Sequence, residues 1–562
     1  MILGRDKFRA FGLRILNSGE STKIWSWRSP APQHPGDTPM VRVKLAPIGI
    51  AAAFVCSTSL ASAAPFKCPR VGGEFVFGQE ANVNSLDQPA SSTISTRNIA
   101  MNIFETLMTR DENNNPITDL AESYAESPDR LTYTFKIRQG VKFHNGKPMT
   151  SADVLASFDR YNKIGLERGM FKNVAGWDAP DASTFVIRMK QAQPTFIEQI
   201  SSFSVPIVII PAELKDDPAM QLRVVGTGPW QLVDFTPGSQ VKLRRYDGYA
   251  PNTKYEERTG FGGYKQACFD TVVFRIVTES GARVAGLKTG ELQGVEDLPT
   301  KSLDDLKKDK NVTVVPLLNW WVQIALPSIS APPTDNLLVR KAVQAALDMD
   351  EIMDAATDGN YKLNVGFQYP NQPSYTDAGK ETYNIKDPAK AKEYLKQAGY
   401  KGEPIVLLTN KDYTSMYNAA LVMAEQLKAV GMKAELKVVD WPTSVGIMTK
   451  NEPGWNFFFT GYGTQPALGA LATMQFFAPP NANYKPAEGK DDPDLIKAWD
   501  DMNNMPDPKD RQAAFVRMQK LILEKVYAVP FGSLTKVQGV RANVQGFKSF
   551  RIPRVSNVWF AN

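Results

Sequence analysis

AESYAESPDRLTYTFKIRQGVKFHNGKPMTSADVLASFDR, residues 121–160, is the stretch that decides the fold of this chain. Apolar and polar side chains alternate over residues 132–138, which predicts a strand with one buried face and one solvent-facing side. A Gln-Gly turn pair at 139–140 follows, and residues 141–144 predict a second short strand. The first half of the stretch therefore predicts a strand, a turn and another strand.

The second half of the stretch predicts a capped helix. Asn145-Gly146 is a turn pair, and Thr150 stands three residues before Asp153, a capping-box arrangement with aspartate in the place of glutamate. Apolar residues then follow at helical spacing, namely Val154, Leu155, Phe158 and Tyr161. The whole stretch predicts a compact α/β module.

The order of residues in this module carries a family resemblance. LTYTFKIR at 131–138, GVKFHNG at 140–146 and TSADV at 150–154 resemble the signature of extracytoplasmic solute-binding proteins of the peptide/nickel/opine class, the receptors of ATP-driven importers. GTGPW at 226–230 is similar to a second turn of that family. The resemblance implies an α/β fold with mixed sheets in a two-lobed clamshell, an inner-membrane ABC permease complex as partner, and a monomer without catalytic activity or cofactor.

The N-terminal region predicts export. Residues 40–44 are short and basic, residues 45–60 are mostly apolar, and Ala61-Ser62-Ala63 has the spacing of a signal-peptidase site. We interpret residues 40–63 as a signal peptide cleaved near Ala63, which predicts a periplasmic protein. A membrane anchor is the weaker alternative, because the apolar run is shorter than the roughly 20 residues of a membrane span. Residues 1–39 fit a non-native extension upstream of the true start at Met40.

Charge and length narrow the function classes. A chain of 562 residues is longer than a domain with a single hydrophobic core usually is, so two or more domains are expected. The formal net charge is +6, but residues 1–63 hold eight basic and three acidic residues, which leaves the exported chain at +1. No basic footprint for nucleic acid remains.

The cysteines fit an exported protein. Cys56 lies in the signal peptide, so Cys68 and Cys268 remain as a pair. In an oxidising compartment such a pair favours a disulfide, and two unpaired buried thiols are the alternative.

The coarse order of elements predicts two domains. Residues 64–318 together with 529–562 form the larger, discontinuous domain I, and residues 319–528 form an inserted domain II with alternating helices and strands. Two chain crossings between the domains make a hinge, so we expect clamshell closure around a ligand.

Catalytic and metal chemistry are poorly represented in the exported sequence. Its one histidine, His144, lies in a predicted turn, where a structural role outweighs a catalytic one. No zinc-binding pattern is present, and a single histidine disfavours nickel as cargo. A secreted glycosidase with two carboxylates is the competing class, and a chaperone-like role is a third, weaker alternative.

The ligand prediction depends on GYGTQ at residues 461–465. The resemblance implies that this segment holds the ligand, and Gln465 takes the place of an aspartate that holds a free peptide amino group in dipeptide receptors. Lys411 is the candidate replacement for an arginine that holds the ligand carboxylate, although only as a point charge. Both ionic anchors of the dipeptide mode are therefore lost or changed.

We accordingly expect a ligand held by aromatic stacking and hydrogen bonds. A blocked or modified peptide, an opine-like amino-acid conjugate and an oligosaccharide all satisfy this expectation. The candidate ligand-binding residues are Tyr462, Gly463, Thr464, Gln465, Trp441, Trp320, Trp321 and Lys411, although core packing is the more common role for any single aromatic residue.

Overall fold

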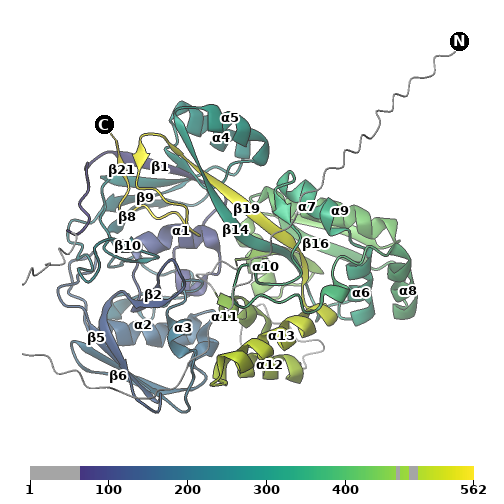
Figure 1. The fold of residues 1–562 in the computed structure, drawn as a ribbon, viewed down its shortest axis with the longest axis horizontal. Coiled ribbons are helices and arrows are strands. Elements are labelled where there is room, and N and C mark those ends of the chain that lie inside the picture. Colours follow the sequence, from purple (N-terminus) through teal and green to yellow (C-terminus); the bar gives the residue numbers. More distant parts are fainter. Residues whose placement is uncertain (1–63, 464–468, 480–490, 562) are drawn as a thin grey trace, which may run out of the picture. The chain divides into compact units, whose positions relative to one another are not determined.

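The computed structural model describes residues 64–463, 469–479 and 491–561, and its elements are arranged around a large mixed sheet (Figure 1). In chain order its strands are β1 (Glu74–Gln79), β8 (Trp230–Thr236), β9 (Gln240–Arg245), β12 (Thr271–Ile276), β13 (Gly294–Val295), β14 (Val312–Pro327), β15 (Tyr361–Lys362), β16 (Pro404–Asn410), β17 (Lys433–Val439), β18 (Phe457–Tyr462) and β19 (Val529–Arg541). Across the sheet the order is β17, β16, β18, β14, β19, β13, β1, β12, β9 and β8, and β15 pairs with β19.

Parallel and antiparallel pairs both occur in this sheet. β1 runs parallel to β12 and β13, and β16 runs parallel to β17 and β18, whereas the other pairs are antiparallel. Helix α9 (Thr414–Ala429) connects β16 to β17, which is a βαβ unit at the place where strand and helix signals alternate in the sequence.

The stretch at residues 121–160 forms two strands of a smaller, four-stranded sheet and the helix that packs against that sheet. The strands, in order across this sheet, are β4 (Ala121–Glu126), β5 (Thr132–Ile137), β7 (Thr184–Met189) and β6 (Val174–Asp181), and α2 (Ser151–Ile164) packs against β6 and β7. Tyr133, Phe135 and Ile137 are buried, as the alternation predicts. The Thr150 N–H donates to Asp153 Oδ2 at 2.9 Å, so the aspartate completes the start of α2.

The predicted second strand at residues 141–144 is absent from the described structure. An isolated bridge between Lys142 and Pro148 stands in its place, because proline has no N–H to continue a ladder. His144 in this turn donates from Nε2 to the Gly228 carbonyl at 2.9 Å and accepts at Nδ1 from the Gly226 N–H at 3.2 Å. Burial lowers the pKa of His144, so its imidazole is neutral. Its two hydrogen bonds connect the turn at residues 140–146 with the turn at residues 226–230.

Two long strands connect the halves of the large sheet. β14 and β19 pair antiparallel, and their ladder is interrupted between Leu317 and Trp321. Beyond this interruption β14 also pairs with β18, starting at Val322. The interruption lies at the predicted chain crossing, but the bounds of domains I and II stay a prediction.

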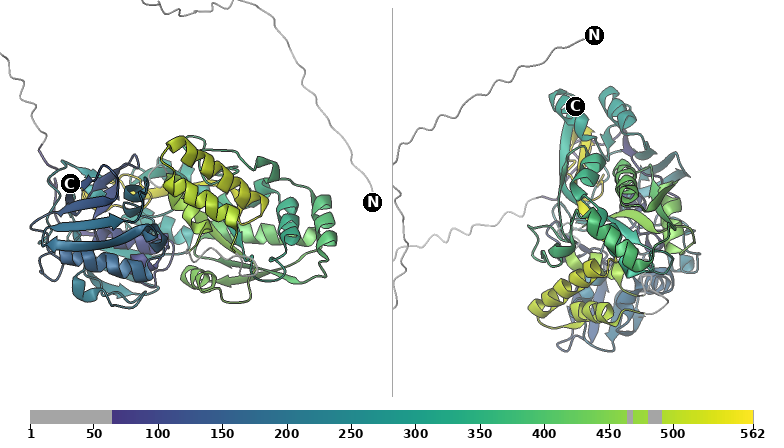
Figure 2. Two further views of the ribbon diagram at one scale, coloured as in Figure 1. Left: turned by 90° about the horizontal axis from the view of Figure 1, so that it is seen from below. Right: turned by 90° about the vertical axis from the view of Figure 1, so that its right-hand side faces the viewer.

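Helices cover both parts of the sheet, and residues 63–562 form one compact unit. The remaining helices are α1 (Ile94–Ile103), α3 (Phe196–Ile200), α4 (Ser280–Thr289), α5 (Leu303–Lys308), α6 (Leu337–Ala346), α7 (Met349–Thr357), α8 (Pro388–Ala398), α10 (Trp441–Thr449), α11 (Gly469–Met474), α12 (Pro493–Asn504) and α13 (Pro508–Glu524). Figure 2 shows α12 and α13 side by side. Short pairs complete the fold, namely β2 (Met108–Arg110) with β3 (Pro116–Thr118), β10 (Arg258–Thr259) with β11 (Gly262–Gly263), and β20 (Val544–Gln545) with β21 (Trp559–Phe560).

A disulfide joins Cys68 to Cys268, whose Cα atoms are 5.5 Å apart, and so ties the segment before β1 to the segment before β12. Among the described residues, no helix combines the length and the apolar character needed to cross a membrane. In the same part of the chain, no group of three histidine, cysteine or acidic residues is placed to hold a metal ion.

Candidate functional site

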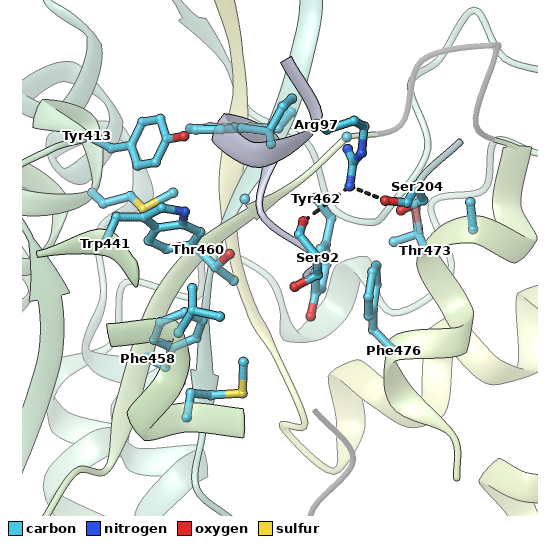
Figure 3. A pocket seen from close by; sticks show the side chains of 18 of the residues that line it. Ser92, Arg97, Ser204, Tyr413, Trp441, Phe458, Thr460, Tyr462, Thr473 and Phe476 are labelled. Atoms are coloured by element: carbon cyan, nitrogen blue, oxygen red, sulfur yellow. Dashed lines mark hydrogen bonds between the residues drawn. The ribbon is translucent and has the colours of Figure 1, made fainter. Parts of the chain in front are cut away.

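A cavity lies where α1, β18 and α10 meet a segment near the C-terminus (Figure 3). Its lining includes Arg97 from α1, Trp441 from α10, Tyr462 from β18 and Arg551 from the C-terminal segment. Under the predicted division, the two arginines belong to domain I and the two aromatic residues to domain II. A ligand in this cavity would therefore touch both domains.

Two aromatic pairs face each other across the cavity (Figure 3). Tyr462 stacks on Phe476 with ring centroids 4.7 Å apart and planes 4° from parallel. Trp441 stacks on Phe458 at 5.9 Å and 16°. Stacked rings offer flat apolar walls against which a planar or apolar part of a ligand can pack.

Tyr413 packs against the rings of two tryptophan residues of the lining. It lies between β16 and α9 and meets Trp321 edge-on at 5.4 Å and Trp441 edge-on at 5.3 Å. Edge-to-face contacts of this kind contribute beyond the area that they bury. The three rings form one rigid wall.

The glycines of the GYG segment make room for this wall. A Cβ on Gly461 would lie 2.5 Å from Cδ2 of Trp321, and a Cβ on Gly463 would overlap the guanidinium of Arg551. Tyr462, between them, points to the other side of the strand, as side chains alternate along a strand. The two glycines therefore leave space for the side chains of Trp321 and Arg551, and the tyrosine between them lies on the other side of the strand.

Two buried arginines give the cavity its charge. Arg97 is 3% exposed, and its guanidinium donates to the carbonyls of Ser92, at 3.2 Å, and Ser204. Burial and the nearby Arg551 guanidinium lower the pKa of Arg97 to about 9, and burial lowers the pKa of Arg551 to about 10. Both remain cationic at neutral pH.

The acidic residue beside Arg97 does not cancel this charge. Burial raises the pKa of Glu167 to about 8, although Arg97 and a hydrogen bond with Ser204 act in the opposite direction. The carboxyl is therefore mainly protonated at neutral pH. None of the described residues that line the cavity is aspartate or glutamate.

Several buried polar atoms of the lining have no hydrogen-bond partner among the described residues. They are Nε of Arg97, Oη of Tyr413, Nε1 of Trp441 and Oγ1 of Thr473. In Figure 3 the ring nitrogen of Trp441 and the hydroxyl of Tyr413 are turned toward the side of the cavity that holds Arg97. An unsatisfied buried donor is costly, so these atoms are available to hydrogen-bond a molecule that enters the cavity.

The structure brings together half of the predicted site residues. Trp321, Trp441, Tyr462 and Gly463 line the cavity. The side chain of Trp320 and residues Thr464 and Gln465 lie outside the described residues.

Lys411 does not line this cavity. Its side chain is exposed, and its ammonium lies 5.2 Å from the ring centre of Tyr417. It follows β16 directly, whereas its neighbour two positions on, Tyr413, points inward. The cationic groups of the site come from Arg97 and Arg551 instead.

Neither arginine is among the predicted site residues, for separate reasons. The apolar residues between positions 98 and 108 predict a helix over that range, whereas α1 spans Ile94–Ile103 and is followed by β2. Ser91-Ser92-Thr93 is a helix-start signal that would have placed Arg97 in the helix. Arg551 lies in irregular structure near the C-terminus and carries no local signal.

Comparison with known proteins defines the class. Residues 115–484 match the family described as Bacterial extracellular solute-binding proteins, family 5 Middle. This match covers more than half of the chain, and the chain belongs to that family. The predicted family and the solute-receptor class are therefore confirmed, and the members of the family are extracytoplasmic binding proteins.

Individual relatives agree with this assignment. A probable peptide ABC transporter periplasmic-binding protein of Sinorhizobium fredii is 27% identical over 468 residues, which cover 80% of this chain and 87% of that protein. A glutathione-binding protein of Salmonella typhi is 26% identical over 518 residues, which cover 90% of this chain and 95% of that protein.

Solved structures confirm the two-lobed α/β fold. A periplasmic binding protein of A. tumefaciens in complex with agropinic acid matches with a TM-score of 0.76 at 22% identity, over 87% of this chain and 99% of that chain. An oligopeptide-binding protein of Bacillus subtilis in complex with a nonapeptide matches with a TM-score of 0.76 at 22% identity, over 88% of this chain and all of that chain.

Proposed function

We propose that this protein is the periplasmic receptor of an ABC importer and binds a peptide-like or modified amino-acid solute in the cavity of Figure 3. The observation that supports this proposal most directly is the lining of the cavity. It combines stacked aromatic rings with buried polar atoms that have no hydrogen-bond partner among the described residues. Such a mixture of apolar walls and a few oriented polar groups is typical of small-molecule sites. Closure of the two predicted domains would bury the solute.

The receptor works without catalysis. The single histidine of the exported chain is occupied in joining two turns. A glycosidase needs two carboxyl groups that flank the scissile bond, and none of the described lining residues is acidic. The protein is exported by cleavage near Ala63 and delivers its solute as a monomer to the inner-membrane permease.

Tryptophan fluorescence and calorimetry on the exported protein test the proposal. The panel holds N-blocked and free dipeptides, glutathione, opine-type conjugates and oligosaccharides. A bound solute should change the emission of Trp321 and Trp441, which line the cavity. Recovery of the solute unchanged after incubation supports a receptor, whereas turnover that depends on the protein contradicts it.

A further inference from the structure

The charge of the cavity lining is one-sided. Arg97 and Arg551 contribute two buried guanidiniums, whereas none of the described lining residues is an aspartate or a glutamate. Like charges in surroundings of low dielectric constant repel each other, and an anion bound beside them relieves that repulsion. The lining therefore favours a negatively charged ligand.

The buried polar atoms that have no hydrogen-bond partner among the described residues also favour a negatively charged ligand. Arg97 Nε and Trp441 Nε1 can only donate a hydrogen bond, and the hydroxyls of Tyr413 and Thr473 can donate or accept. A carboxylate offers several acceptor lone pairs to such donors, whereas an ammonium group offers none. The cavity lining therefore complements a ligand group that is rich in hydrogen-bond acceptors.

The start of α1 adds to this preference. Ser92 and Ile94 line the cavity, so the first turn of this ten-residue helix faces the ligand space. The first turn carries no acidic residue, and the partial positive charge of a helix N-terminus favours anions.

From these three observations we infer that the solute is an anion whose carboxylate lies beside Arg97 and Arg551 and accepts hydrogen bonds from Trp441 and Tyr413. The inference rests on the proposed receptor function and names its substrate class. Opine-type conjugates and N-blocked acidic peptides belong to this class, whereas cationic peptides and neutral oligosaccharides do not.

Calorimetry on matched solute pairs tests the inference. Each N-acetyl dipeptide and each N-carboxyalkyl amino acid is offered as the free acid and as its carboxamide, and lysyl dipeptides and maltooligosaccharides complete the panel. The free acids should bind roughly 10- to 100-fold more tightly than their carboxamides, because hydrogen bonds to a charged group are lost in the amide.

Two tyrosine variants supply a matched comparison. Tyr413→Phe removes a hydroxyl without a described partner and should weaken binding of the free acid roughly 10-fold with little change in the melting temperature of the ligand-free protein. Tyr161→Phe removes a buried hydroxyl that donates to the Val205 carbonyl at 2.6 Å, outside the cavity. It should lower the melting temperature and leave the affinity unchanged.

A third variant tests the charge itself. Arg97→Gln should weaken binding of the acid more than binding of its carboxamide, and Arg97→Lys should restore part of the difference. Acids and carboxamides that bind equally well, or tight binding of lysyl peptides or sugars alone, would overturn the anion inference and leave the receptor proposal standing. Absence of binding across all groups of solutes would count against the receptor proposal itself.

Discussion

The guanidinium of Arg551 occupies the space in which a Cβ on Gly463 would lie. The residue that follows β18 and an arginine from the C-terminal segment thus fit together because the glycine has no side chain. Through this fit, the GYG segment leaves room for a positive charge in the cavity lining, and Tyr462 contributes an aromatic ring to the same lining.

Replacing Gly463 by alanine should therefore displace Arg551. The displaced atoms are the far end of a flexible side chain, so the cost in folding free energy should lie at the low end of the roughly 1–3 kcal/mol of overpacking, and the solute should bind at least roughly 10-fold more weakly. Chemical denaturation and calorimetry measure the two effects. Gly446→Ala is the matched control, because its Cβ would meet nothing within 4 Å and alanine is favoured within a helix such as α10. Wild-type affinity in Gly463→Ala would show that Arg551 is not needed at its observed position.

The disulfide predicts a strong effect of reduction. Cys68 and Cys268 are 200 residues apart in sequence, and the loop-entropy account assigns a bridge of this span up to about 5 kcal/mol. Reductant should lower the midpoint of chemical unfolding in the wild-type protein and have no effect on the double variant Cys68→Ser/Cys268→Ser. Two free thiols in the oxidised exported protein, detected by alkylation and mass spectrometry, would contradict the bridge.

The comparison of sequence with structure shows where local signals suffice. Strand β5 follows from its alternation and α2 from Thr150 and Asp153, because each element is set by neighbours in sequence. The cavity depends on contacts between distant segments, which composition and periodicity do not encode. Trp441 and Tyr462 could be proposed from their motif and aromatic character, but Arg551 reaches the site through tertiary packing alone.

The Glu167 carboxyl should make stability depend on pH. Its pKa is raised by burial from an ordinary value of 4.5 to about 8 in the folded protein. Between these values the folded state holds a proton that the unfolded chain has lost, so the free energy of unfolding falls as pH rises from about 5 to 8. Each pKa unit corresponds to about 1.4 kcal/mol.

Glu167→Gln should flatten the pH dependence of unfolding in this window, as measured by urea denaturation at several pH values. Asp181→Asn is the control, because hydrogen bonds from Ser183 lower the pKa of Asp181 to about 2 and both states are ionised above pH 5. A variant curve parallel to that of the wild type would show that Glu167 is ionised in the folded protein.

Lys536, in strand β19, lies beside the cavity that we propose binds the solute, and its replacement should affect both stability and binding. Its ammonium contacts Glu80 and lies 3.1 Å from a carboxylate oxygen of Glu296, and all three groups are buried. The same ammonium lies 6.0 Å from the ring centre of Trp321 and 5.9 Å from that of Tyr413, two residues of the cavity wall. The ammonium of Lys536 therefore packs against two rings of the cavity wall.

Lys536→Met leaves two buried carboxyl groups without their shared cation, which should lower the free energy of unfolding by about 3–5 kcal/mol. Lys172→Met is the control, because Lys172 pairs with Asp500 at the surface and such pairs contribute at most about 1 kcal/mol. The triple variant Lys536→Met/Glu80→Gln/Glu296→Gln also removes the two carboxylates, of which Glu80 has a second partner in Arg283 at 3.6 Å. It should recover part of the lost stability but not the wild-type affinity, since the rings of Trp321 and Tyr413 still lack the ammonium beside them. Full recovery of affinity in that variant would limit the role of Lys536 to folding.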